Sequence, residues 1–307
     1  MRSLSISYEP MTNDSYSPIT SLSAADGPAN GALWPAPAAA GALNATLTIP
    51  GSKSLTNREL VLAALAEGPS KLSAPLHSRD SERMIAGLTA LGVAFTPING
   101  TGRFGPDLLV TPPDKLHAGG TVDCGQAGTV MRFLPPLAGL VAGEVHFEAD
   151  DNALHRPMGP MITALRELGV DVDDSGRWAL PFSVRGHGHV RGGELEIDAS
   201  SSSQFVSGLL LAASRFDVGM HLRHTGPRLP SVPHIDMTVE ALQHRGVRVE
   251  RPSAHEWVVA AGPIRAKDIA VEPDLSNASP FLAAAMVAGG SVSITGWPLH
   301  STQPGAL

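Results

Sequence analysis

Apolar and polar positions along the chain form two helical patterns with short β patterns between them, and this arrangement repeats. In one helical pattern a Leu lies four positions before a Gly-Val pair. The pattern occurs three times, in segments that begin at Met84, Met161 and Met237. Its Leu residues, Leu88, Leu165 and Leu242, are 77 residues apart in both intervals (165 − 88 and 242 − 165). A fixed period of this length predicts repeated supersecondary units.

Each of these segments ends in a glycine, which predicts a left-handed helix cap, and β-forming residues such as Val93-Ala94-Phe95 then predict a strand. A second helical pattern alternates with the first. Its segments follow Ser54 or begin at Ala127, Ser202 and Ser279. The predicted unit is therefore βαβαββ, present three times. A fourth copy begins near Ile269, and the sequence ends at Leu307, about half a period later.

The same patterns predict the domain organisation. Residues 1–41 are rich in Ser, Ala, Pro and Gly and are interpreted as a disordered tail, whereas LNATLTIP from Leu43 predicts a strand. We predict one complete domain of three units over 54–268 and an incomplete domain formed by 42–53 and 269–307. Because repeated units bury their apolar faces against complete neighbours, we expect residues 269–307 to be poorly packed.

Composition narrows the class of protein. With 307 residues, 43% of them apolar, the chain is expected to be globular, with two domains. The net charge of −7 argues against a nucleic-acid partner and means that an anionic ligand needs a local basic pocket. The single cysteine, Cys124, gives no intramolecular disulfide. With no signal-peptide pattern and no apolar run of membrane-spanning length, these features predict a cytoplasmic protein.

Candidate chemistry begins with PGSKSLTNR, from Pro50 to Arg58, where a strand leads into a helix. Hydroxyls, free helix amides and the cations Lys53 and Arg58 are suited to an anion. The phosphate-binding P-loop is excluded, because its glycines are not at the required offsets before Lys53. The alternative interpretation is an ordinary helix cap with two solvated cations.

Two further motifs have similar chemistry. DCGQAGTVMRFLPP places Gly125 and Gly128 before a helix that contains Arg132, and LHRPMGPM places Arg156 before another helix start. Each has a structural alternative, since glycine turns before helices and solvated arginines are common. Cys124 is interpreted as a small buried residue and not as a nucleophile.

The remaining motifs are DASSSSQF, from Asp198 to Phe205, and Ser231 in LPSVPHIDM. Their hydroxyls could bind a polyol, although serine runs are also ordinary caps. Four of the five motifs begin helices of the repeat. We therefore expect these helix N-termini to converge on one highly charged anion.

Other candidates are weaker. His187 and His189 resemble a metal-ligand pair, but their Gly-rich context predicts a hairpin and no third zinc ligand is suitably spaced. Glu272 and Asp274 precede a helix and are interpreted as acids favoured by its dipole.

The order PGSKSLTNR, GQAGTVMRFLPP, RPMGPM, SSSQF and SVPHIDMTV closely resembles the 5-enolpyruvylshikimate-3-phosphate (EPSP) synthase family in its actinobacterial form, over about residues 43–302. The resemblance implies an α/β enolpyruvyl transferase fold, an inside-out α/β barrel. It also implies carboxyvinyl transfer from phosphoenolpyruvate to shikimate 3-phosphate in chorismate and aromatic amino-acid biosynthesis. No cofactor or metal is implied, and the family is usually monomeric.

The resemblance also assigns site residues. Lys53 is the implied catalytic residue, with Gln126 and Arg132 in supporting positions. The residues implied for shikimate 3-phosphate are Lys53, Ser54, Arg58, Ser202, Ser203, Gln204 and Ser231. Those implied for phosphoenolpyruvate are Lys53, Gly128, Arg156 and Gln204.

Departures from the family pattern are Gln126 for Asn, His234 for Tyr, and Asn152 where some members carry a basic residue. The acids, arginines and late lysine of the family's final third are absent, so we expect this chain alone to be inactive or nearly so. Two alternatives remain open: a non-catalytic or truncated product that binds phosphoshikimate, and the related UDP-N-acetylglucosamine enolpyruvyl transferase.

Overall fold

The computed structural model describes residues 2–8, 38–98 and 103–306, the first range as backbone. These residues form two compact units. Unit 1 comprises Met1–Ile49 and Asn277–Leu299, and unit 2 comprises Pro50–Ser276 and His300–Leu307. The chain thus passes between units at 49/50, 276/277 and 299/300, whereas the sequence predicted boundaries after 53 and 268 only. The second difference arises because helix α8 (Leu275–Ala288) crosses the boundary between the units.

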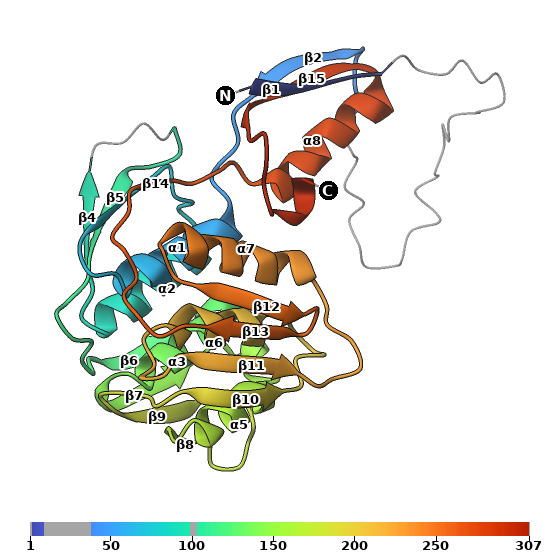
Figure 1. Ribbon diagram of the computed structural model, residues 1–307. Coiled ribbons are helices and arrows are strands. Elements are labelled where there is room, and N and C mark those ends of the chain that lie inside the picture. The colour runs from blue at the N-terminus through green and yellow to red at the C-terminus, as the bar shows by residue number, and fades with distance from the viewer. Residues whose placement is uncertain (1, 9–37, 99–102, 307) are drawn as a thin grey trace. The chain divides into compact units, whose positions relative to one another are not determined.

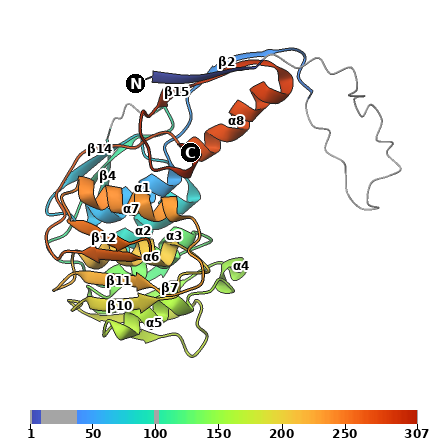
Figure 2. The same ribbon diagram turned by 45° about the vertical axis from the view of Figure 1, so that its right-hand side comes forward.

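Unit 2 contains three four-stranded sheets with equivalent topology. In the sheet of order β6-β7-β9-β8, β6 and β7 are parallel and the remaining pairs are antiparallel. The sheet β10-β11-β13-β12 has the same pattern. Figure 1 labels its four strands stacked in this order, and Figure 2 shows β10, β11 and β12 in the same succession. The third sheet is β14-β3-β5-β4, whose outer parallel strand β14 comes from the C-terminal end of the unit. The predicted βαβαββ repeat is therefore confirmed.

The strand bounds in unit 2 are β3 Ser70–Ser73, β4 Ala94–Ile98, β5 Asp107–Thr111, β6 Gly120–Asp123, β7 Ala142–Glu148, β8 Asp171–Asp173, β9 Phe182–His187, β10 Gly193–Ile197, β11 Met220–His224, β12 Val249–Ser253, β13 Glu256–Val259 and β14 Ile269–Ala270.

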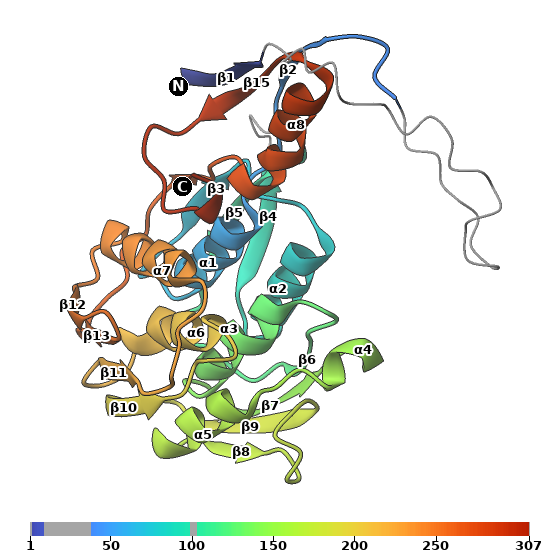
Figure 3. The same ribbon diagram turned by 90° about the vertical axis from the view of Figure 1, so that its right-hand side faces the viewer.

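Helices of the second predicted pattern occupy the interior of unit 2. They are α1 (Lys53–Ala64), α3 (Gly128–Ala138) and α6 (Gln204–Ala213), and each buries at least nine residues. Helices of the first pattern, α2 (Arg79–Ala90), α5 (Gly159–Glu167) and α7 (Val232–His244), bury one face. Figures 1 and 3 show α1, α3 and α6 lying between the three sheets. Sheets outside and helices inside confirm the predicted inside-out α/β barrel.

The predicted glycine caps are also present. Gly92, Gly169 and Gly246 have φ values of 95°, 81° and 82° and follow α2, α5 and α7. A side chain is strained at these angles, so glycine lets the chain leave the helix and enter the next strand.

Unit 1 contains the three-stranded sheet β1-β15-β2 and most of α8. β15 (Gly290–Trp297) pairs with β2 (Leu43–Leu47) in parallel and with β1 (Arg2–Tyr8) in antiparallel fashion. Five side chains form its buried apolar cluster: Ile49, Ala278, Ala285, Val292 and Ile294. The helical turn η1 (Pro304–Ala306) belongs to unit 2.

Two local expectations differ from the structure. The predicted disordered tail, residues 1–41, includes β1, which forms by pairing with a strand nearly 290 residues away; its residues 9–37 lie outside the described residues. The hairpin predicted around His187 and His189 is wrong, because β9 and β10 belong to different sheets. A short helix that the sequence did not predict, α4 (Asp151–Leu154), precedes Arg156.

Candidate active site

The site begins with the N-termini of interior helices that lack the usual caps. Ala127 and Ser203, the N-cap residues of α3 and α6, make no side-chain capping hydrogen bond. Neither helix has an acidic residue in its first turn. The first N–H groups of a helix have no acceptor within it, and its N-terminus carries partial positive charge. Both helix starts are therefore suited to a bound anion.

Side chains from these two helices, α3 and α6, contact each other near the helix starts. Arg132 Nη1 is 3.1 Å from Gln204 Oε1 and 3.2 Å from the carbonyl oxygen of Gly128. A Cβ atom at Gly128 would lie 3.0 Å from both Arg132 Nη1 and Gln204 Oε1, and 3.8 Å from Arg156 Nη1. The structure thus brings together Gly128, Arg132, Arg156 and Gln204, which we call the arginine cluster. Glycine at 128 keeps the space among them open.

The arginine cluster has an excess of positive charge. Arg132 is 7% exposed, and its Nε atom has no hydrogen-bond partner. Burial, together with the neighbouring charge of Arg156, lowers the pKa of Arg132 to about 10. Within the described part of the chain, neither arginine pairs with a carboxylate. Two adjacent guanidinium groups without a counterion favour a phosphate or carboxylate ligand.

Gln126 and Arg156 are held by a neighbouring polar network. Arg156 Nη1 donates to the carbonyl oxygen of Gln126 at 2.6 Å, and Gln126 Nε2 donates to Asp150 Oδ2 at 3.2 Å. Asp150 also pairs with Arg79 at 2.8 Å. The Gln126 side chain is therefore engaged away from the cluster, while its backbone orients Arg156.

Lys53 lies at the start of α1, half-exposed. Its Nζ atom is 3.1 Å from Asp80 Oδ2, and its backbone N–H donates to Asp274 Oδ2 at 3.2 Å. Ser52 caps the helix by accepting from Leu55 N, and Ser54 is half-buried. The Asp80 contact was not predicted; its one sequence signal is an acid in the first turn of α2. No described contact joins Lys53 to the arginine cluster.

Arg58 is more enclosed than the sequence suggested. It is 1% exposed, and burial lowers its pKa to about 10. Its donors reach Thr238 Oγ1 at 2.8 Å, the Ser54 carbonyl at 2.9 Å, the His234 carbonyl at 2.7 Å and Ser207 Oγ at 3.3 Å. Four of the five guanidinium N–H groups are thus used, and one on Nη1 remains. Arg58 mainly links α1, α6 and α7.

The candidate serines lie at the starts of α6 and α7. Ser202 Oγ accepts from Gln204 N at 3.2 Å, and Ser203 is buried. Ser231 is exposed and has left-handed backbone angles, φ 52° and ψ 48°. The polar contacts that join the helix starts, Asn57 to Thr129 at 2.8 Å and Ser207 to the His234 carbonyl at 3.4 Å, were not predicted. Such contacts carry no local sequence signal.

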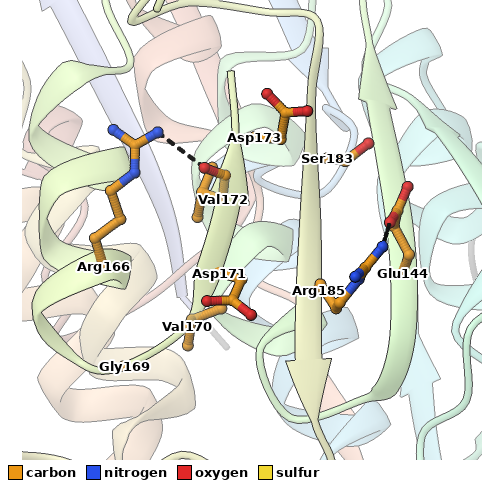
Figure 4. A pocket seen from close by; sticks show the side chains of 9 residues that line it. All are labelled: Glu144, Arg166, Gly169, Val170, Asp171, Val172, Asp173, Ser183 and Arg185. Atoms are coloured by element: carbon orange, nitrogen blue, oxygen red, sulfur yellow. Dashed lines mark hydrogen bonds and ion pairs between the residues drawn. The ribbon is translucent and has the colours of Figure 1, made fainter. Parts of the chain in front are cut away.

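Two cavities in unit 2 lie apart from these residues. One, of about 550 Å³, lies on the strands β7, β8 and β9; Figure 4 shows Arg185 paired with Glu144 beside Asp171 and Asp173. With more acids than unpaired cations, it is unsuited to an anion. The other, of about 350 Å³, is lined by α1, α7 and residues 269–272, with Glu240 and Glu272 among its acids.

The histidine pair does not form a metal site. His187 pairs with Asp171 at 3.3 Å and His189 with Asp217 at 3.0 Å, so each has its own carboxylate. Among the described residues, no group of three or more His, Cys, Asp or Glu side chains is placed to hold a metal ion. Burial raises the pKa of Cys124 well above its usual range, which agrees with its interpretation as a buried, unreactive residue.

The fold and the arginine cluster together define a class: an α/β protein built of βαβαββ units, with a candidate anion site at its helix starts. The model of the EPSP synthase (3-phosphoshikimate 1-carboxyvinyltransferase) family matches residues 37–307. This chain belongs to that family.

Individual relatives agree. The chain is 55% identical over 278 residues to the 3-phosphoshikimate 1-carboxyvinyltransferase of Kocuria rhizophila, which covers 89% of this chain and 62% of the relative. Two solved structures of EPSP synthase from Acinetobacter baumannii, one at 2.37 Å, superpose with TM-scores of 0.68 at 23% identity. They cover 82% and 83% of this chain and 55% and 56% of their own chains, and they show the fold.

The chain therefore spans about three fifths of the length of the curated relative. None of the described helices combines the length and the apolar content needed to cross a membrane.

Proposed function

We propose that this protein takes part in transfer of the carboxyvinyl group of phosphoenolpyruvate to the 5-hydroxyl of shikimate 3-phosphate. The hydroxyl oxygen adds to C2 of phosphoenolpyruvate while its methylene carbon gains a proton. The hydroxyl proton leaves as this C–O bond forms. Loss of a proton from the new methyl group and of phosphate from C2 then restores the C=C double bond and gives the enol ether product. We further propose a cytoplasmic location, which the sequence features indicate, and a monomeric state, which the resemblance implies.

The observation that best supports this proposal is the arginine cluster. Arg132 and Arg156 lie beside the starts of α3 and α6, whose N-cap residues make no side-chain capping hydrogen bond, and neither arginine has a carboxylate partner among the described residues. Phosphoenolpyruvate offers both a phosphate and a carboxylate. We propose that Gly128, Arg156 and Gln204 bind it, with Arg132 in support and Gln126 positioning Arg156.

Shikimate 3-phosphate is proposed to bind at the starts of α1, α6 and α7. Lys53 and Ser54 would contribute the α1 end, Ser202, Ser203 and Gln204 the α6 end, and Ser231 the α7 end. Arg58 would contribute its remaining Nη1 donor and hold the three helices in register. Lys53, half-exposed and paired with Asp80, is the proposed catalytic cation and would exchange that carboxylate for substrate.

Isothermal titration of the 307-residue chain with shikimate 3-phosphate tests the binding part of the proposal. We expect saturable binding, weakened about tenfold or more in Lys53→Ala and Ser202→Ala, because hydrogen bonds to a charged ligand are lost. Arg185→Ala, which removes an exposed cation from the outer strands, is the matched control and should bind as wild type does. A folded wild-type chain that does not bind would contradict the proposal for this chain.

Phosphate release from phosphoenolpyruvate plus shikimate 3-phosphate tests the chemical part. Wild type and Arg156→Ala are both prepared free of host enzyme, and each ligand's concentration is varied in turn. For Arg156→Ala we expect weaker binding of phosphoenolpyruvate and unchanged binding of shikimate 3-phosphate. Equal loss of both ligands in Arg156→Ala would contradict the division of roles.

A further inference from the structure

Two loops of unit 2 carry the candidate serines, and one buried histidine lies between them. The first loop, residues 198–203, leads from β10 into α6, and the second, residues 225–231, leads from β11 into α7. His224, the last residue of β11, is 4% exposed. Its Nδ1 atom is 3.1 Å from the Ala199 backbone nitrogen, and its Nε2 atom is 3.0 Å from the Arg228 carbonyl oxygen.

The neighbouring groups determine the tautomer of His224. The Arg228 carbonyl can only accept, so Nε2 carries the proton and donates. The Ala199 N–H can only donate, so Nδ1 is unprotonated and accepts. Nδ1 is also 3.3 Å from the Ile197 carbonyl, but that oxygen already accepts from Thr225 N at 3.0 Å. The neutral Nε2–H imidazole therefore satisfies one group on each loop.

Other contacts hold the same two loops together. The Thr225 N–H bond to Ile197 joins them at their bases. A Cβ atom at Gly226 would lie 2.0 Å from Asp198 Oδ1 and 2.1 Å from Ser200 Oγ, so the second loop lies directly against the first. Asp198 Oδ1 in turn accepts from Ser200 N at 2.9 Å. His224 is thus the side chain at the centre of a packed junction.

The junction between the two loops holds the backbone that leads to Ser231. Ser231 has a left-handed backbone that costs free energy in a residue other than glycine, and such angles persist only where the surroundings hold them. Beyond the junction, the first turns of α6 and α7 are linked by Ser207, Arg58 and the His234 carbonyl. A shift at His224 would therefore move Ser202 and Ser231 relative to each other.

We propose that His224 is a positioning residue: by bonding Ala199 and Arg228 as a neutral imidazole, it fixes the spacing of the two serine loops for a phosphorylated polyol. It does not contact the ligand. This inference rests on the proposed function for the identity of that ligand, shikimate 3-phosphate.

Three variants test separately the His224 hydrogen bonds to Ala199 and to Arg228. His224→Phe keeps a ring and removes both bonds. His224→Asn keeps an acceptor near the Nδ1 position, and His224→Gln keeps an amide donor near the Nε2 position. His189→Asn, which changes an exposed histidine on another loop, is the matched control.

The first measurement, amide hydrogen exchange, needs no ligand. In His224→Phe we expect residues 198–203 and 225–231 to exchange about tenfold faster or more, because two buried groups lose their partners. His224→Asn should restore protection mainly in 198–203, and His224→Gln mainly in 225–231, whereas His189→Asn changes neither. Nitrogen NMR of wild type should show His224 Nδ1 unprotonated.

The second measurement is titration with shikimate 3-phosphate. We expect His224→Phe to bind about tenfold more weakly, with partial rescue by Asn and Gln. Unchanged loop exchange in His224→Phe, or a proton on Nδ1, would overturn the inference, and so would faster exchange with unchanged affinity. Absence of binding by wild type would overturn the proposed function instead, and the exchange pattern would still decide whether His224 holds the loops. If His224→Phe does not fold, the Asn and Gln variants decide the same question.

Discussion

Helices α6 and α8 have similar apolar sequences but very different surroundings. In α6, nine of ten residues are buried, and the helix packs against α3 and α7 inside unit 2. In α8, within unit 1, Phe281, Met286 and Val287 are exposed, the last to 89%. The difference teaches that an apolar pattern predicts a helix but not how deeply that helix is buried.

The two units also differ in what they bury, because unit 2 buries charged side chains as well as apolar ones. Two arginines of unit 2 are almost fully buried: Arg58, which is 1% exposed, and Arg245, which pairs with Glu59 at 2.8 Å. Arg245 also donates to Ser70 and to the Arg265 carbonyl. Unit 1 has five buried apolar side chains in its cluster, two of them alanine. Neighbours that pack or hydrogen-bond, and not hydrophobicity alone, therefore determine burial in this chain.

The largest expected effect comes from the enclosed pair in unit 2. Arg245→Ala leaves the Glu59 carboxylate buried without its counterion, so we expect a loss of about 3 to 5 kcal/mol in the free energy of unfolding, measured by urea denaturation. The control is Arg185→Ala, which breaks the exposed pair with Glu144 and should leave the free energy of unfolding nearly unchanged. Equal effects of the two substitutions would mean that burial of the pair has no energetic consequence.

The repeat explains how much of this could be predicted from the sequence. The 77-residue spacing of Leu88, Leu165 and Leu242, with a glycine after each helix, is a local pattern, and it led to the correct sheets, helices and caps. It also indicated which helices begin at candidate residues, since α1, α3 and α6 start beside Lys53, Gly128 and Gln204.

What could not be predicted depends on contacts distant in sequence. Strand β1 exists by pairing with β15, although Leu4, Ile6 and Tyr8 do show a weak period of two. The motif PGSKSLTNR suggests that Arg58 is a free cation. In the structure Arg58 is hydrogen-bonded by Thr238, Ser207 and His234, which lie 149 to 180 residues away in the sequence. The Lys53 contact with Asp80 and the role of His224 likewise required the tertiary arrangement.

A smaller effect is expected from the apolar cluster of unit 1. Ile294→Ala removes a fully buried side chain from β15, so we expect local opening of that strand to become easier by about 2 kcal/mol. Amide exchange should be faster in β15 and β2 and unchanged in α6. Leu211→Ala, at a fully buried position in α6, is the control and should give the reverse pattern. Equal acceleration in both regions would show that the two clusters unfold as one.

The smallest effect is expected at the exposed face of α8. Val287→Ser replaces a side chain that already lies in water, so the free energy of unfolding should change by no more than about 0.5 kcal/mol. The comparison is Val206→Ser in α6, where the hydroxyl would be buried and a packed methyl lost, at a cost of more than about 2 kcal/mol. Thermal and urea unfolding of both variants measures the difference. A large loss in Val287→Ser would mean that this face of α8 is covered in solution, and α8 would then resemble α6 in its surroundings as well as in its sequence.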